Sequence, residues 1–403
     1  MGKRVWLISV LICFAVMDVA AQAVSYRDSI GGVTHYTPID YSALMRELER
    51  ASRPTLWQRL TGAASQRKSN AQDRKISLSG NVGVGYTQLT NAMFTATGTA
   101  QYRLQPELPQ SFTSLSAMVS VNGFYRLHAA GEAHLSQSDK IEYSIGGGEM
   151  PVRFWGLGYE AADNNSRTKY TRGGVDFSLG YVRHIVAGLS LGAGVDFRYA
   201  TAGELEPMAE DYLQQAGLKA GSAHTTGINL MVKYDGKIQT EDVVSGYYLC
   251  LAGGFHPKAL GSHSTNIWHI EAVANYYQPL WSGAVAALDL YADMWSWNTP
   301  WLFWAKVGGE NRMRGYYYGR YTDRKMATAQ LELRQRIYGP IGCVVWGGVG
   351  SVFSSHKLFD VDRLLPNYGV GVRFAAGGRT SLRIDYGFGR HSNGLVINVN
   401  EAF

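Results

Sequence analysis

The stretch that decides the fold is Leu189-Ser190-Leu191-Gly192-Ala193-Gly194-Val195-Asp196-Phe197-Arg198-Tyr199. Apolar residues occupy every second position, and Gly, Ser, Asp or Arg fill the positions between them. Successive side chains of a β-strand point to opposite sides, so this segment predicts a strand with one apolar and one polar face. Its length and alternation are typical of a strand that crosses a membrane, with lipid on one side and water on the other.

The same alternation recurs from Lys75 to Phe403, with a second clear case at 327–334. We expect strands near 76–86, 93–104, 113–122, 124–135, 139–148, 170–183, 187–200, 225–235, 246–256, 266–277, 280–294, 325–338, 341–353, 367–376, 380–388 and 394–403. That is about 16, an even number within the range of single-chain barrels. The sequence therefore predicts an all-β protein, a transmembrane antiparallel β-barrel.

A soluble β-sandwich also alternates, but several features favour a barrel. Beyond the N-terminal residues, no stretch is apolar enough for a membrane helix. A closed barrel is the other structure that satisfies all backbone hydrogen-bonding groups inside a membrane. Aromatic residues gather at predicted strand ends, where interfacial girdles belong: Trp281, Trp295, Trp297, Trp301, Trp304, Tyr276 and Tyr277. The predicted inward faces carry too many ions for a dry core: Asp289, Asp293, Glu332, Arg334, Arg373, Arg383 and Asp385.

The first 23 residues predict that the chain is exported. Lys3 and Arg4 precede an apolar run and then Ala21-Gln22-Ala23, which is the layout of a secretory signal peptide over 1–23. Residues 24–75 are expected to form a short periplasmic helical segment, with a helix over 40–51, and a basic linker. That segment is either a plug or cap of the barrel, or an unstructured leader. The barrel takes residues 76–403.

A long aromatic loop lies between the eleventh and twelfth predicted strands. It contains Gly308-Gly309, then Arg314-Gly315-Tyr316, Gly319-Arg320-Tyr321 and Asp323-Arg324. This order resembles the sixth extracellular loop of the BamA/TamA superfamily, the bacterial surface antigen barrels. The resemblance continues through Glu332-Leu333-Arg334, Asn367-Tyr368-Gly369, Leu382-Arg383-Ile384-Asp385 and the closing Glu401-Ala402-Phe403. The chain resembles a short member of that family without POTRA domains.

The resemblance implies that the loop folds into the lumen and that Arg314, beside Gly315 and Tyr316, contacts acids on strands 12 and 13. Glu332 points inward by the alternation and matches the strand-12 acid. The strand-13 position holds Gly348 instead. We therefore expect Asp289, Asp293 or Asp385 to provide the second carboxylate, because an unpaired buried charge is costly.

Phe403 resembles the terminal aromatic residue through which outer-membrane barrels are recognised for assembly. We expect it to be a lipid-facing anchor and the handle for the outer-membrane assembly machinery. The other partners we expect are outer-membrane lipid and an unidentified periplasmic or surface protein. The net charge of +6 is small for a chain of 403 residues and spread along it, so it indicates no nucleic-acid partner.

Three functions are compatible with a polar-lined barrel of the Gram-negative cell outer membrane. The resemblance implies that the barrel assists insertion, export or display of protein or lipid, through the lumen or the seam between its first and last strands. A passive pore or structural barrel is the alternative. An outer-membrane hydrolase is the third, but the histidines are scattered, without a Gly-x-Ser-x-Gly element or a paired metal spacing. We therefore expect no enzymatic activity, no cofactor and no metal.

Overall fold

The computed structural model describes residues 76–239, 244–261, 265–354, 360–375, 381–399 and 401–403. The predicted signal peptide (1–23) and the predicted helical segment and linker (24–75) lie outside the described residues.

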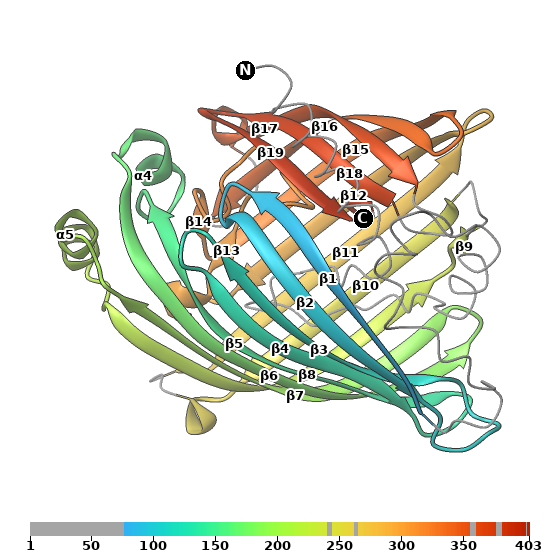
Figure 1. The fold of residues 1–403 in the computed structure, drawn as a ribbon. Helices are drawn as coiled ribbons and strands as arrows, with labels where there is room; N and C mark the ends of the chain where they lie inside the picture. Colours follow the sequence, from blue (N-terminus) through green and yellow to red (C-terminus); the bar gives the residue numbers. More distant parts are fainter. Residues whose placement is uncertain (1–75, 240–243, 262–264, 355–359, 376–380, 400) are drawn as a thin grey trace, which may run out of the picture.

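Sixteen long antiparallel strands form a closed barrel (Figure 1). They are β1 (Ile76–Thr87), β2 (Asn91–Tyr102), β3 (Ser111–Ser120), β4 (Tyr125–His134), β5 (Asp139–Phe154), β6 (Thr168–Val186), β7 (Leu189–Gly203), β8 (Gly221–Asp235), β10 (Val244–His256), β11 (Ile267–Pro279), β12 (Ala284–Trp295), β15 (Lys325–Tyr338), β16 (Ile341–Phe353), β17 (Leu365–Ala375), β18 (Ser381–Gly389) and β19 (Ser392–Val399). The predicted fold class is confirmed, and each predicted strand corresponds to one of these.

The largest difference from the predicted bounds is in β5, which was expected to end at 148 and continues to Phe154. Its pairing with β4 ends at Tyr125–Glu149, whereas its pairing with β6 runs on to Phe154–Thr168. Beyond Glu149 the strand therefore has one neighbour only. Proline is tolerated on such an edge because its missing N–H removes no ladder bond there, so Pro151 does not end the strand.

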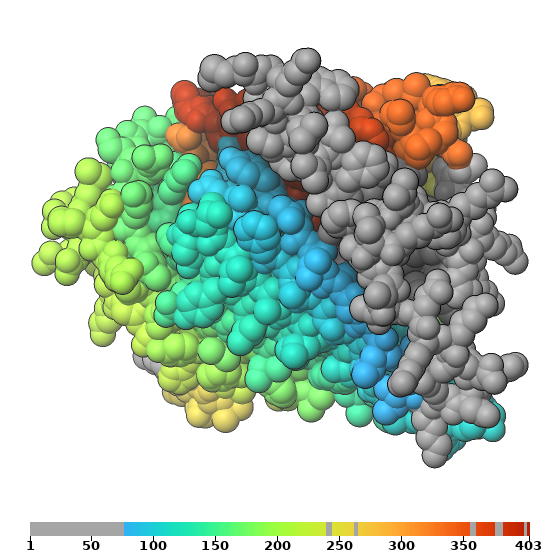
Figure 2. Space-filling view, in the orientation of Figure 1, coloured from blue at the N-terminus to red at the C-terminus, as the bar shows by residue number. Residues whose placement is uncertain are grey.

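Alternate residues of each strand face the lumen and the outside. On β15, Leu331 is 56% exposed on the outer wall, while the next residue, Glu332, is 0% exposed inside. The ions predicted to face inward lie in the lumen. Figure 2 shows the side chains of β1 to β4, in blue to teal, as one continuous outer surface.

The two ends of the barrel differ. The loop end carries α4 (Tyr159–Asn164), α5 (Pro207–Gln215), the 3-10 helices η1 (Lys258–Leu260) and η3 (Val361–Arg363), and the long connection from β12 to β15. The opposite end, the turn end, has tight connections such as that between β6 and β7, and the two-residue strand β9 (Ile238–Gln239) beside β10. Among the described residues, no helix is long and apolar enough to cross a membrane. Short turns on one side and longer loops on the other are typical of outer-membrane barrels.

The aromatic girdle expected near 276–304 forms only in part. Trp281, in the turn between β11 and β12, and Trp297, just after β12, are 59% and 65% exposed. Trp295, Trp301 and Trp304 are instead buried in an apolar cluster at the loop end of the lumen. The reason is that Trp295 falls on the inward face of β12, opposite His269, and that the chain after it turns into the barrel.

Candidate functional site

The connection between β12 and β15, residues 296–324, folds into the barrel, and we call it the lumen loop. It begins with η2 (Trp301–Phe303) and continues as a short hairpin of β13 (Ala305–Lys306) and β14 (Thr322–Asp323). Between the arms of this hairpin the chain carries the Arg-Gly-Tyr motif into the lumen.

Arg314 is fully buried at the inner end of the lumen loop. Its Nη2 donates to Oε1 of Glu332 on β15, and its Nη1 donates to Oδ2 of Asp385 on β18 at 2.6 Å. Its Cζ lies 3.8 Å from the centre of the Trp346 indole ring on β16. Both carboxylates are fully buried. A buried cation is tolerated only when carboxylates and hydrogen bonds compensate for lost hydration, and this arrangement meets that requirement.

Three more arginines extend the ion pairs along the inner wall. Arg334 donates from Nε to the other carboxylate oxygen of Glu332 at 2.9 Å. Arg373 donates from Nη1 to Oδ1 of Asp385 at 2.5 Å, and Arg383 lies 3.8 Å from the same carboxyl group. Each of the two carboxylates therefore has cationic partners besides Arg314.

Gly315 brings the backbone of the lumen loop against the barrel wall. Its φ is +103°, and a Cβ atom there would lie 2.5 Å from the backbone carbon of Gly387 on β18. The reverse also holds, since a Cβ on Gly387 would lie 2.4 Å from the carbonyl oxygen of Arg314. Glycine is needed at both positions because backbone atoms cannot move aside as a flexible side chain can.

Tyr316, the next residue of the motif, is anchored to β17 and to the β18–β19 turn. Its hydroxyl donates to the carbonyl oxygen of Pro366 at 2.6 Å and accepts from the backbone N–H of Arg390 at 2.7 Å. Burial raises the pKa of Tyr316 to about 12. The hydroxyl is therefore protonated at neutral pH and acts as a donor.

The structure brings together Arg314, Glu332 and Asp385 of the predicted site. The other two candidate carboxylates have different partners. Asp289 receives a two-pronged interaction from Arg312 of the lumen loop, at 2.7 and 2.9 Å. Asp293 pairs with His269 at 2.9 Å. Of the three acids expected to replace the carboxylate missing from strand 13, Asp385 is the one that contacts Arg314.

Sequence reasoning missed Trp346 and the role of Gly348. Trp346 lies opposite Glu332 in the β15–β16 register, so the alternation already indicates that it faces the lumen. A Cβ on Gly348 would lie 2.7 Å from Cγ of Gln330. Gln330 accepts a hydrogen bond from the backbone N–H of Met313 at 2.9 Å. Gln330, which also anchors the lumen loop, thus fills the space that an acidic side chain at position 348 would need.

Phe403 does not face lipid as expected. Its ring packs in the lumen against the cluster of Tyr277, Val285 and Ala287. Its carbonyl oxygen accepts from Nη2 of Arg334 at 2.9 Å, and that guanidinium lies 5.0 Å from the ring centre. The chain therefore turns inward after β19, because the wall inside offers both an apolar surface and a donor.

The seam between the first and last strands is weakly paired. Within the described residues, β1 meets β19 at one residue pair, Tyr86 with Ile397. By contrast, β1 pairs with β2 along its whole length, from Ile76–Tyr102 to Thr87–Asn91. The sheet is closed, but at this seam most of the edge of β1 has no ladder partner among the described residues of β19.

Comparisons with known proteins match the barrel. Residues 70–394 match the family described as the Omp85 superfamily domain. No curated protein matches the sequence. Among solved structures, BamA from Haemophilus ducreyi lacking POTRA domains 1–3 has a TM-score of 0.59 at 12% identity, over 81% of this chain and 70% of that one.

Two CdiB structures are similar as well. CdiB from Acinetobacter baumannii has a TM-score of 0.52 and CdiB from Escherichia coli one of 0.56, each at 12% identity over 81% of this chain. The matches cover 60% and 63% of those chains, so this chain spans less than two thirds of either. At such identity the likeness shows a shared fold.

Proposed function

This chain belongs to the Omp85 superfamily, and from that premise we propose that it assists the insertion, export or display of protein or lipid at the Gram-negative outer membrane. A sixteen-strand barrel of this family is an outer-membrane protein. We propose outer-membrane lipid and the outer-membrane assembly machinery as its partners. The Arg314 arrangement serves in this proposal to hold the lumen loop in place while the seam acts.

The observation that carries the proposal is the seam. An unpaired strand edge exposes N–H and C=O groups that seek partners, and such groups cannot stay unsatisfied in the hydrocarbon layer. Because Tyr86–Ile397 is the one pair that joins β1 to β19 in the described part of the chain, separating the two strands costs few ladder bonds. A passenger strand or a lipid that enters at this seam would find both an opening and a hydrogen-bonding edge.

A disulfide across the seam tests this function. Opposed residues of antiparallel strands lie within the Cα spacing that a disulfide needs, so Tyr86→Cys with Ile397→Cys should lock the seam under oxidation. Cys250 and Cys343 form no disulfide in the described residues, and both are replaced in the parent. Val84→Cys with Phe94→Cys, opposed residues on β1 and β2, is the matched control.

Cells that carry the locked seam should show the same change in outer-membrane protein and lipid composition as cells that lack the gene. Reductant should reverse the change, and the control pair should behave as the parent. A locked protein that fully complements the deletion would show that the seam is not the working part.

A passive pore is the second candidate, and the buried ions of the inner wall favour it. The lumen loop occupies part of that lumen, so a protein whose work is done at the seam should conduct poorly in planar bilayers. Steady large conductance by the parent protein would favour the pore instead. We include no catalytic step in either proposal. Among the described residues the most buried histidine–carboxylate ion pair joins His269 to Asp293, and its imidazole stacks on Trp295 with ring centres 3.9 Å apart. No group of metal-ligating residues occurs in that part of the chain.

A further inference from the structure

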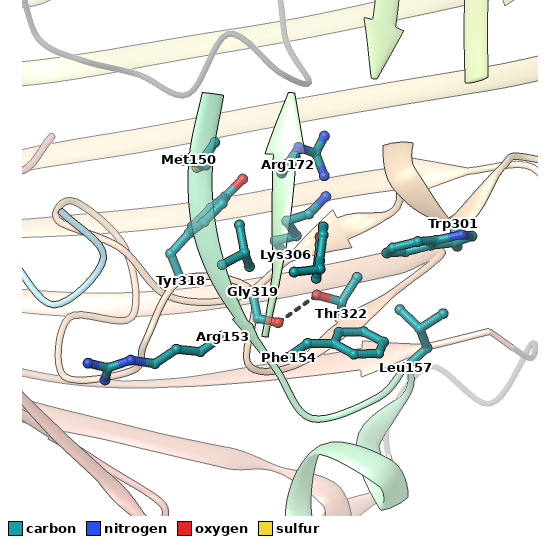
Figure 3. A pocket seen from close by; sticks show the side chains of 12 residues that line it. Met150, Arg153, Phe154, Leu157, Arg172, Trp301, Lys306, Tyr318, Gly319 and Thr322 are labelled. Atoms are coloured by element: carbon teal, nitrogen blue, oxygen red, sulfur yellow. Dashed lines mark hydrogen bonds between the residues drawn. The ribbon is translucent and has the colours of Figure 1, made fainter. Parts of the chain in front are cut away.

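A second feature of the lumen loop lies on the side away from Arg314, where the loop faces β5 and β6. A small cavity separates them there (Figure 3). Met150, Phe154 and Arg172 line it from the wall, and Trp301, Lys306 and Tyr318 line it from the loop. Its enclosed part is about 20 Å³, which is close to the space of one water molecule.

Arg172 is the unusual member of this lining. Its side chain lies on the inward face of β6 and is 3% exposed. No carboxylate in the part of the chain that the structure describes reaches any of its three guanidinium nitrogens. The phenol of Tyr170, two residues earlier on the same face, is its electrostatic and hydrogen-bonding neighbour, but a neutral phenol does not balance the charge.

The nearest acid on the same face of β6 is not available to Arg172. Asp176 is already bound by Arg126, whose Nη2 lies 2.5 Å from its Oδ1. The cavity has a second cation, Lys306, whose Nζ donates to the carbonyl oxygen of Trp304 at 2.8 Å. In Figure 3 the ends of Arg172 and Lys306 lie on the same side of the cavity, while Arg153 extends away from it. No carboxylate is among the lining residues.

An unpaired buried guanidinium costs free energy unless an anion compensates for it. Its planar fork matches the oxygens of phosphate and carboxylate groups. We propose that this cavity is an oxyanion site, in which Arg172 and Lys306 hold the phosphate of a small anion or of a lipid headgroup between the lumen loop and β6. Because the enclosed space is so small, only the terminal oxygens enter it, and the remainder of the ligand stays in the open lumen.

The site would give the lumen loop a further anchor, on its β6 side. On the β15–β18 side the loop is held by ion pairs within the chain, whereas on the β6 side the charge of Arg172 is balanced by no carboxylate of the described residues. This inference is independent of the proposed function, because it concerns the charge balance of the loop and not the seam.

Calorimetric titration of the purified full-length barrel in non-ionic detergent tests the proposal. Sodium phosphate is titrated at constant ionic strength into the parent protein, into Arg172→Gln and into a control, Arg198→Gln. Arg198 also faces the lumen, on β7, but it already pairs with Asp196 at 2.9 Å. The parent and the control should bind phosphate saturably, and Arg172→Gln should bind at least about tenfold more weakly, since charge-assisted hydrogen bonds contribute that much.

Thermal unfolding adds a readout with a distinctive sign. In phosphate-free buffer Arg172→Gln should be at least as stable as the parent, because the substitution removes an uncompensated charge. Phosphate should then raise the midpoint of the parent but not of the variant. Equal destabilisation of the variant with and without phosphate would mean that an acidic group of the protein already compensates for the charge of Arg172, and would overturn the proposal.

A further arm separates the two sources of the anion. Mixed micelles that contain phosphorylated lipid A replace free phosphate: a response to the lipid alone assigns a headgroup, and a response to free phosphate assigns a small anion. No saturable response of the parent to either one overturns the proposal, as does equal binding by Arg172→Gln. Should that variant not fold, Arg172→Lys, which keeps the charge but loses the fork, should bind more weakly and still saturably.

Discussion

Trp346 provides the surface on which Arg314 rests: the guanidinium carbon lies 3.8 Å from the indole centre. β16 thus contributes an aromatic face where the family resemblance implied an acid at the position of Gly348. The second carboxylate comes from Asp385, two strands further along the wall. The cation is enclosed by two carboxylates and one ring, drawn from three strands.

Removal of Arg314 should release the lumen loop. Arg314→Ala leaves the two buried carboxylates short of one partner, and breaking such a buried arrangement costs about 3–5 kcal/mol. Limited proteolysis of the folded barrel should then cut within 296–324. Glu332→Ala should give the same cleavage, and the double variant should be little worse than either, since the residues act as one unit.

Arg183 provides the matched control for this test. It is 61% exposed and lies 3.7 Å from Asp139 at the surface, and exposed pairs contribute little. Arg183→Ala should therefore leave the loop protected. A loop that stays protected in Arg314→Ala would show that the ion pairs do not hold it.

Trp346 should matter through its aromatic face. Trp346→Phe keeps a weaker cation–π surface, whereas Trp346→Leu removes it, with a loss of about 1–2 kcal/mol for a desolvated pair. The unfolding midpoint should fall in the order parent, Phe, Leu. Equal midpoints for the Phe and Leu variants would indicate that only the volume of the indole counts.

Gly387 should tolerate no side chain. A Cβ there would lie 2.4 Å from the carbonyl oxygen of Arg314, so Gly387→Ala should displace the loop and expose it to protease. Gly347→Ala is the control, because an added Cβ at Gly347 on β16 meets nothing within 4 Å. Protection of the loop in Gly387→Ala would contradict the close approach of the two backbones.

Phe403 allows assembly and packing to be separated. If its ring is the handle for the assembly machinery, Phe403→Asp should sharply lower the amount of folded barrel in cells. Val285→Ala weakens the apolar surface that receives the ring without changing the terminus, and should have a small effect. Similar losses in both variants would indicate that packing in the lumen, and not recognition, explains the requirement.

The predicted signal peptide has its own test. The mature protein should begin near Val24 and should appear in outer-membrane fractions with heat-modifiable mobility, as a closed barrel does. Retention of Met1 in the purified protein, or its recovery in the soluble fraction, would contradict this prediction.

The positions of the strands along the chain could be predicted because alternation is a local property of the sequence. The burial of Glu332 beside exposed Leu331 follows directly from it. The choice of Asp385 over Asp289 could not be predicted in this way. Both face the lumen, and the choice depends on how far the loop reaches, which places Arg312 rather than Arg314 beside Asp289.

The inward turn of Phe403 and the helices α4 and α5 also escaped prediction, for a related reason. Short elements in loops carry few periodic positions, and α4 spans only Tyr159–Asn164. Apolar surface is available to the terminal ring on both sides of the barrel wall. Its position depends on Arg334 and Tyr277, which are distant in sequence.

The enclosure of Arg314 has a consequence for the order of events during folding. Arg314 and Asp385 are separated by 71 residues, and pairings of such long range form late because chain closure opposes them. The partners of Arg314 lie on β15, β16 and β18, so the lumen loop can be locked once these strands are paired, without the seam. We therefore expect the loop to be in place before β19 closes on β1 at Tyr86–Ile397. In time-resolved refolding, protease protection of the loop should appear before or together with the compact electrophoretic form, and protection that appears later would refute this order.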